Sequence, residues 1–304
     1  MNTEPFHIIS DSSCDLPEEY VKENNITIVP FYVRFGDEPD KKEREEIRVR
    51  DFYQRMVDEP DNFPKSSMPS IRDFMDAMLP FAKAGMPAIV ICITTKFSGC
   101  YQCAKNAREM VLEDYPDARI TVIDSTINTV LQGLYTMEAV RLRDRGVAFE
   151  DAVSILEEIK STGRIFFSVA NINYLKVNGR IGKVAKGLTS MLGIRPVITL
   201  KEGEIFCSGV ARTRKATTRK SIELLRDYVR TTKATPETYA LDIGFGYDYD
   251  EAVRFREDIL AMLHNEGFML EEKDFPIFQI GSGIGVHTGP HPLGVTIIKK
   301  ALPD

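Results

Sequence analysis

The chain lacks any apolar run long enough to cross a bilayer, since its longest runs, such as AIVICI, are far too short for a transmembrane helix. Its first residues, MNTEPFHIISDSS, lack the basic segment and the long apolar stretch of a signal peptide. Cysteine is sparse and odd in number, with five residues that mostly have apolar or small neighbours. These absences predict a reduced, cytoplasmic protein with no integral membrane segment and at most transient contact with a membrane.

Positive charge is not in excess either. The 39 lysines and arginines are outnumbered by 45 aspartates and glutamates, so the net charge is -6. This balance argues against a protein that coats nucleic acid, and the absence of a helix-turn-helix pattern argues against a transcription regulator. The 304 residues, 43% of them hydrophobic, are enough for one large domain or two ordinary ones.

Familiar nucleotide and hydrolase motifs are missing. There is no G-x-x-x-x-G-K-[ST] phosphate loop. The segment GSGIGV begins like a dinucleotide fingerprint, but Val286 replaces its last glycine, and Pro290 and Pro292 predict that it opens no helix. In TKFSGC, Lys96 stands where the G-x-S-x-G elbow of hydrolases has its first glycine.

No metal or cofactor site is predicted. The pair Cys100 and Cys103 has no second pair to complete a zinc ribbon, and the packing of two small residues in the first turn of a helix explains it more simply. The histidines are scattered, and the glycine and proline between the last two exclude the helical spacing of a metal-binding pair. The four histidines are His7, His264, His287 and His291.

The first half of the chain alternates strand and helix patterns. Strands are expected at 6–10, 26–35, 88–93 and 119–124. Asp15 and Glu18 match a capping box, which predicts a helix start, and so do Ser70 and Asp73. The alternation predicts a parallel sheet covered by helices. The highly charged stretch at about 36–50 has no periodicity and is predicted to be an exposed loop or small hairpin.

The second half mixes a hairpin around KEGE with helices and further strands, which predicts a mixed or antiparallel sheet. We therefore expect an α/β protein with two lobes. These are an N-terminal α/β lobe with a parallel sheet at 1–163 and a C-terminal α+β lobe at 164–304. Ligands of open α/β sheets bind beyond the carboxyl ends of the strands, so a cleft between the lobes is the expected site.

Hydroxyl groups and a histidine stand where that cleft is expected. Ser98 and Gly99 follow the strand AIVICI and precede a helix, whose free N–H groups and positive dipole end suit an anion. His287 lies among glycines, which would let its backbone turn into the cleft. Two simpler interpretations stay open at this point, namely Ser98 as an ordinary N-cap and His287 as a turn residue.

Six segments, taken in order along the chain, resemble the motifs of the DegV family, the fatty-acid-binding subunits of bacterial fatty acid kinase. They are IISDSSCDLP, KSSMPS, TTKFSGCYQCA, NINYLKVNGRIGK, MLGIRPVITLKEGEI and GVHTGPHPLGV. Each segment alone is weakly specific, whereas all six in order from end to end are strongly so. The resemblance implies a two-lobed fold that encloses one long-chain fatty acid in a tunnel between the lobes.

The resemblance also implies a function. The carboxylate of the bound acid would be presented to a separate kinase subunit, which transfers the γ-phosphoryl group of ATP to it and makes an acyl phosphate for phospholipid synthesis. The chain itself would then be a lipid carrier rather than an enzyme and would need no cofactor, because ATP and Mg belong to the partner kinase. By position, the groups that bind the carboxylate fall on Ser66, Ser98, Gly99 and His287, and the arginine of the cleft that faces the kinase falls on Arg180.

Apolar residues near the motifs are candidates for the wall around the acyl chain, although each also fits an ordinary core: Met191, Leu192, Ile194 and Ile284. Lys96 and Phe97 depart from the family pattern of Gly and Leu, and are placed to alter chain preference or kinase docking. The alternative function is a serine hydrolase or esterase with Ser98 as nucleophile and His287 as base, for which no acid that orients the histidine can be named.

Overall fold

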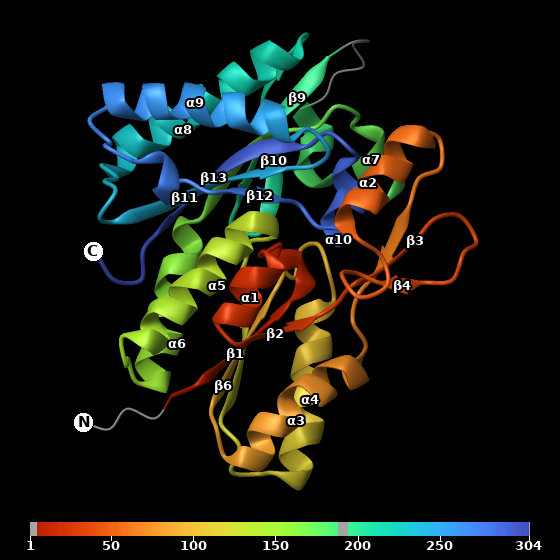
Figure 1. Ribbon diagram of the computed structural model, residues 1–304, viewed down its shortest axis with the longest axis vertical. Coiled ribbons are helices and arrows are strands. Elements are labelled where there is room, and N and C mark those ends of the chain that lie inside the picture. The colour runs from red at the N-terminus through yellow and green to blue at the C-terminus, as the bar shows by residue number, and fades with distance from the viewer. Residues whose placement is uncertain (1–4, 188–193, 304) are drawn as a thin grey trace.

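The computed structural model describes residues 5–187 and 194–303. Within these ranges the strands form a four-stranded, a six-stranded and a three-stranded sheet. The two larger sheets lie in different halves of the elongated molecule, one above the other, with helices between and around them (Figure 1). No helix in the described part of the chain is long and apolar enough to cross a membrane.

The four-stranded sheet comes from the first half of the chain, and all its strands are parallel, as predicted. In spatial order its strands are β2 (Ile26–Val29), β1 (His7–Asp11), β6 (Ala88–Cys92) and β7 (Ile120–Asp124). Both central strands, β1 and β6, are buried along their whole length, which explains their unbroken apolar sequences.

Helices cover both faces of this parallel sheet. Ile9 and Val90 pack on one face against α3 (Ile71–Ala84) and α4 (Cys100–Asp114). Ile8, on the opposite face, packs towards the remaining helices of this half. Those helices are α1 (Glu18–Glu23), α5 (Thr129–Asp144) and α6 (Phe149–Ile159). The layers are therefore helix, sheet, helix, as the βα alternation predicted.

The six-stranded sheet belongs to the second half of the chain and is mixed. In spatial order it contains β10 (Glu204–Ala211), β9 (Arg195–Lys201), β8 (Arg164–Ser168), β13 (Leu293–Lys299), β11 (Tyr239–Phe245) and β12 (Ile277–Gln279). Neighbouring strands are antiparallel except for the parallel pair β11 and β12. The predicted hairpin around KEGE is the turn between β9 and β10, where Glu202 and Gly203 both have positive φ.

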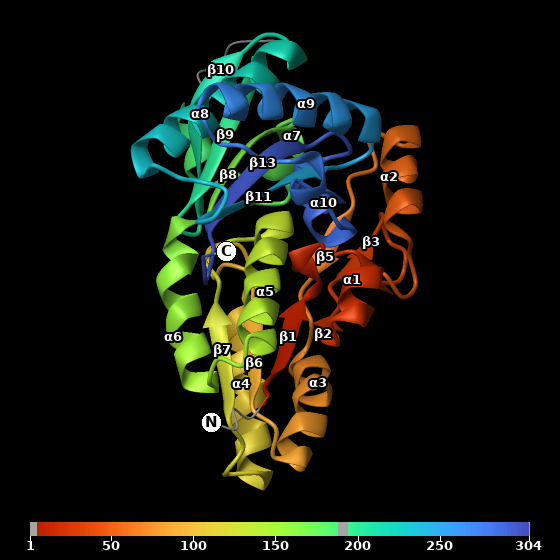
Figure 2. The ribbon, with the colours of Figure 1, turned by 60° about the vertical axis from the view of Figure 1, so that its left-hand side comes forward.

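Helix α5 lies between the two large sheets. Figure 2 shows its upper end directly beneath the strands of the six-stranded sheet, while α8 (Arg214–Thr232) and α9 (Tyr249–Asn265) cover the far face of that sheet. Because α5 is enclosed on two sides, side chains around most of its circumference are buried, including the polar Gln132 and Thr136. The residues at its N-terminal end, Asn128, Thr129 and Val130, line the cavity described below.

A small antiparallel sheet stands beside this junction. Its strands are β4 (Lys41–Lys42), β3 (Tyr32–Arg34) and β5 (Lys65–Ser67). It packs against α10 (Ser282–Thr288), which also contacts α2 (Val49–Asp58) and α7 (Asn173–Val177). This group of short elements, none of which was predicted in full, carries part of the cavity described below.

The structure corrects four of the sequence predictions. The strand expected at 26–35 divides at Pro30 into β2 and β3, which belong to different sheets. The segment 36–50 does contain a small hairpin strand, but Glu43 within it is only 1% exposed. The capping box expected at Asp15 does not form, because α1 begins after Pro17 and Asp15 bonds elsewhere.

The fourth correction concerns the segment that resembled a dinucleotide fingerprint. It does form a helix, α10, although the prolines at 290 and 292 had predicted none. Those prolines lie beyond the end of the helix, where Gly289 has a φ of 78° and ends it. His287 is thus a residue of the last helical turn and not of a loop.

Candidate functional site

A cavity lies between the two large sheets, above the carboxyl ends of β1 and β6. It contains about 1080 Å³ of empty space, part of which is open solvent. Most of its lining is apolar and comes from both halves of the chain: Phe31, Ile93, Phe97, Val130, Ile165, Phe167, Leu175, Leu200, Ile205, Ile280, Ile284 and Leu293. The cavity suits a ligand that is largely hydrocarbon.

The predicted polar residues meet in this cavity. Ser66 on β5, Ser98 and Gly99 before α4, and His287 on α10 all line it. The Oγ atom of Ser66 is 3.2 Å from Nε2 of His287, although the two residues are 221 positions apart in the sequence. Arg180 lines the same cavity, so five predicted polar positions share one space.

Ser98 and Gly99 form the turn that starts α4. Gly99 is the N-cap residue, and Ser98 Oγ accepts the N–H of Cys100 at 3.2 Å. The N-cap interpretation of the serine is therefore correct in part, since its oxygen satisfies one N–H of the first turn. The same hydroxyl keeps its own proton to donate, and the turn faces the cavity. A helix start of this kind favours an anionic group.

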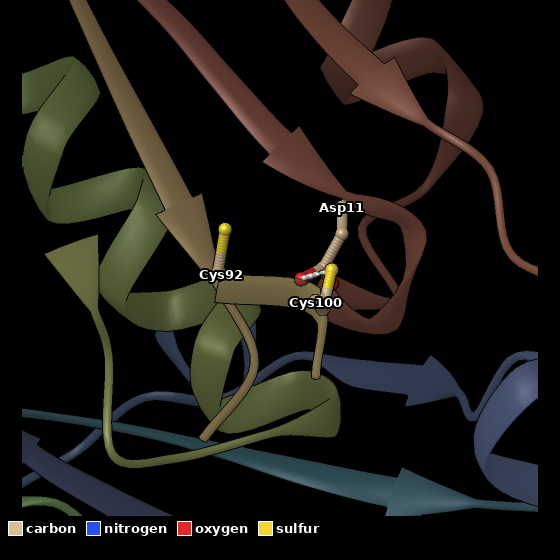
Figure 3. A group of neighbouring side chains, drawn as sticks. All are labelled: Asp11, Cys92 and Cys100. Atoms are coloured by element: carbon tan, nitrogen blue, oxygen red, sulfur yellow. Dashed lines mark hydrogen bonds between the residues drawn. The ribbon is translucent and has the colours of Figure 1, made fainter. Parts of the chain in front are cut away.

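Beneath this turn lies a group of buried side chains, Asp11, Cys92 and Cys100 (Figure 3). Their potential ligand atoms are all within 4.8 Å of one another, so the group has the spacing of a metal site. The Asp11 carboxylate, however, already accepts the N–H of Ile93 at 2.7 Å and the Cys100 thiol at 3.3 Å.

Burial also raises the pKa of both thiols and of Asp11, which disfavours the thiolate form that metals bind. The hydrogen bonds instead tie the end of β1 to the beginning of α4, and so fix the Ser98–Gly99 turn. Cys103 packs nearby, with its thiol directed at the carbonyl of Pro69 at 3.3 Å. The two cysteines of the C-x-x-C thus act as small packing residues, as the sequence suggested.

The imidazole of His287 is neutral near pH 7. Burial, and then the positive charge of Arg180, lower the pKa of His287 to about 4. Its Nε2 faces Ser66, while its Nδ1 is buried and has no hydrogen-bond partner among the described residues. A neutral imidazole donates one hydrogen bond and accepts another, so it can bind an acid group without holding a full counter-charge.

Arg180 stands at the exposed mouth of the cavity. Its Nε donates to the carbonyl of Phe97 at 2.9 Å, and its Nη1 donates to the carbonyl of Asn178 at 3.0 Å. Asn178 in turn donates to the carbonyl of Val286 at 2.9 Å, next to the histidine. These bonds link the loop before α4, the loop after α7 and the last turn of α10 around one opening.

The predicted wall of the acyl chain has mixed support. Ile284 lines the cavity. Ile194 is described but does not line it. Met191 and Leu192 lie outside the described residues. Phe97, which departs from the family pattern, also lines the cavity, next to Ser98 in the sequence.

The glycines around His287 have a role other than the predicted one. A Cβ on Gly281 would lie 2.5 Å from carboxylate oxygens of Asp15 and Glu43, and a Cβ on Gly285 would lie 2.8 Å from the hydroxyl of Tyr53. The glycines therefore allow α10 to pack closely against other buried groups, and do not serve to free the histidine. Glu43 was missed entirely, because a charged run in a sequence is usually a solvated surface.

Comparison with known proteins places the whole chain in one family. The family model described as "Uncharacterised protein, DegV family" matches residues 5–300. A DegV domain-containing protein of Clostridium acetobutylicum is 30% identical over 95% of this chain and 95% of its own length.

Solved structures agree with this assignment. A stearic acid-binding protein from Eubacterium ventriosum is 40% identical, with a TM-score of 0.91 over 97% of this chain and 99% of that one. A DegV family protein from Thermus thermophilus, reported with its fatty acid binding, is 27% identical, with a TM-score of 0.84 over 97% of this chain and 99% of that one. By its sequence and its two-sheet architecture, the chain is a member of the DegV family.

Proposed function

We propose that this protein binds one long-chain fatty acid, with the acyl chain between the two sheets and the carboxylate among Ser66, Ser98, Gly99 and His287. The observation that carries the proposal is an apolar cavity with hydrogen-bond donors gathered at one end. The likeness to the stearic acid-binding protein supports the same ligand class. The proposal divides the chain into lobes at 1–163 and 164–304, with the acid held between them.

The energetics of such a complex are favourable. Burial of about 14 methylene groups contributes on the order of 11 kcal/mol before the cost of association is subtracted. The carboxylate would receive short, charge-assisted hydrogen bonds from two hydroxyls, a backbone N–H and a neutral imidazole. These donors bind the carboxylate without a buried ion pair. This arrangement suits a carboxylate that is later phosphorylated and must then leave the site.

The direct test is the composition of the purified protein. After denaturation and extraction, mass spectrometry should find long-chain fatty acid at close to one molecule per chain. Lipid-free protein should also take up stearate added in solution. Extracts without acyl species, together with no uptake of stearate, would refute the proposal.

The finer part of the proposal is that a separate kinase subunit phosphorylates the bound acid. The sequence has no phosphate loop, and Arg180 lies exposed beside the polar end, where a partner could reach the carboxylate. Acyl phosphate should form only when a fatty acid kinase subunit and Mg-ATP are added to the loaded protein. Formation of acyl phosphate by this chain and Mg-ATP alone would contradict the partnership.

The hydrolase alternative has less support. Ser98 Oγ bonds to the N–H of Cys100, and the hydroxyl within reach of His287 is that of Ser66. An acid that would orient the imidazole is missing among the described residues, since Nδ1 of His287 has no partner there. An activated ester such as p-nitrophenyl acetate distinguishes the two functions, because a hydrolase would show a burst and a covalent acyl-serine.

A further inference from the structure

We infer that Glu43 is a positioning residue of the carboxylate site, because it seats α10 and thereby sets His287 against Ser66. The inference rests on the proposed function. It assigns a role to the charged segment at 36–50, which inserts this one carboxylate into the interior while its neighbours Glu45 and Glu46 stay exposed.

Glu43 joins three separate parts of the chain through its side chain. Its Oε1 accepts the N–H of Gly283 at 2.9 Å and the hydroxyl of Ser282 at 2.9 Å, both in the first turn of α10. Its Oε2 accepts the hydroxyl of Ser12 at 2.6 Å, directly after β1. A carboxylate that accepts hydrogen bonds on both oxygens is held in one orientation.

The direction of the Ser12 bond is fixed by the backbone. Ser12 Oγ already accepts the N–H of Phe31 at 2.9 Å, so its own proton points to Glu43. The backbone N–H of Glu43 donates to the carbonyl of the same Phe31 at 2.9 Å. Because Phe31 lines the cavity, this closed set of bonds connects the cavity wall to the start of α10.

The carboxylate of Glu43 packs directly against glycines at the start of α10. A Cβ on Gly283 would lie 3.2 Å from Glu43 Oε2, and one on Gly281 would lie 2.5 Å from Oε1. Asp15 lies close to the same point, since its Oδ1 would also be 2.5 Å from a Cβ on Gly281, and its Oδ2 accepts the hydroxyl of Thr129 at 2.6 Å. Burial, and then the negative charge of Glu43, raise the pKa of Asp15.

His287 follows Gly283 by one helical turn. The two residues are four positions apart, and each position adds about 1.5 Å along the helix axis. His287 therefore lies roughly 6 Å along the axis from Gly283, whose N–H donates to Glu43. Because α10 has only seven residues, a shift of its first turn is carried through the helix to its last turn. The contact of 3.2 Å between His287 and Ser66 then depends on a carboxylate that touches neither of them.

The test compares Glu43→Gln and Glu43→Ala with the parent, and Glu45→Gln is the matched control from the exposed part of the same segment. The first measurement is the ¹⁵N signals of the His287 ring in lipid-free protein, assigned by their loss in His287→Ala. The second is the ratio of the dissociation constants of octadecanol and stearate, which isolates recognition of the acid group. A purely structural role would weaken both ligands equally and leave this ratio unchanged.

We expect Glu43→Ala to shift the His287 ring signals and to lower the preference for stearate over octadecanol by about five-fold or more, since misalignment weakens a charge-assisted bond. Glu43→Gln keeps an oxygen that can accept from Gly283, so its effect should be smaller but in the same direction. Glu45→Gln should match the parent.

Unchanged ring signals and an unchanged ratio in both Glu43 variants would overturn the inference. If Glu43→Ala does not fold, Glu43→Gln alone decides by the same two measurements. A parent that binds stearate no better than octadecanol would refute the carboxylate site of the proposed function, and the ring signals of the lipid-free variants would still decide the role of Glu43.

Discussion

At the scale of single residues, the polar end of the cavity contains few donors, so each should matter. We expect Ser98→Ala and His287→Ala each to weaken stearate binding by about ten-fold or more, since loss of one charge-assisted hydrogen bond costs roughly 1.5–3 kcal/mol. Titration calorimetry with lipid-free protein provides the measurement. Both variants should remain folded, because Ser98 bonds within its own turn, and His287 has one side-chain hydrogen bond among the described residues, to Ser66.

The control for this prediction is His264→Ala. His264 is exposed at the end of α9, and its ring bonds to the carbonyl of Leu270 at 2.9 Å, away from the cavity. His7 would be a poorer control, because it is buried, bonds to Thr27 and stacks on Phe81. Parental affinity in His287→Ala would mean that the histidine only packs in the last turn of α10.

A second residue-scale prediction concerns Asp242 on β11. The residue is fully buried and accepts the hydroxyl of the cavity-lining Thr296 at 2.5 Å, and burial raises its pKa to about 7. In the folded protein Asp242 therefore stays protonated up to about pH 7, whereas in the unfolded chain it loses its proton near pH 4. The contribution of this residue to stability is full below that pH and is lost as the pH rises towards 7.

We expect Asp242→Asn to gain stability relative to the parent as the pH is raised from 4 to 8, by up to a few kcal/mol, at about 1.4 kcal/mol for each unit of pKa shift. Urea unfolding at the two pH values measures the difference. The exposed Asp37→Asn is the matched control and should track the parent. A constant difference between Asp242→Asn and the parent at both pH values would show that Asp242 does not carry the raised pKa.

The residue scale also shows what motifs can and cannot predict. Ser66, Ser98, Gly99, Arg180 and His287 were found because they occupy fixed places in motifs, and the structure brings all five to one cavity. The buried carboxylates had no such signal, because local sequence does not reveal whether a charged side chain will find donors in the interior.

At the scale of elements, the position of α10 determines the geometry of the carboxylate site, because His287 lies on this helix. The sequence suggested no helix there, since glycines and nearby prolines both disfavour one. The helix forms because tertiary contacts compensate, with Glu43 accepting from its first turn and Asn178 donating to the carbonyl of Val286 in its last. Local propensity could not have predicted this, whereas the long apolar strands β1 and β6 were evident from sequence alone.

Gly281→Ala tests that close packing. The added methyl would lie 2.5 Å from oxygens of both Asp15 and Glu43, which are fixed by other hydrogen bonds. We expect a loss of about 1–3 kcal/mol in the free energy of unfolding, together with weaker stearate binding. Gly209→Ala is the control, since its methyl would meet only the flexible side chain of Lys220 at 3.4 Å. Equal stability of the two variants would show that α10 can move away at no cost.

At the scale of the whole molecule, each of the two large sheets was predicted from its own sequence pattern. Alternating strands and helices predicted the parallel sheet, and the hairpin predicted the mixed one. Their juxtaposition could not be read from either pattern, because it depends on α5 being covered from both sides. The cavity exists only through that juxtaposition, since its lining combines residues such as Ile93 from one half and Leu200 from the other.

A ligand between the sheets should therefore stabilise both halves together. Stearate that binds only the folded state, at 100 times its dissociation constant, should add about 2.7 kcal/mol to the free energy of unfolding and raise the melting temperature of lipid-free protein by several degrees. Hydrogen exchange should slow on binding in peptides that cover both 93–100 and 280–288. Peptides from α9, on the outer face of the six-stranded sheet, are the internal control and should be unchanged. Protection confined to one of the two segments would place the acid against a single lobe and contradict a site between the sheets.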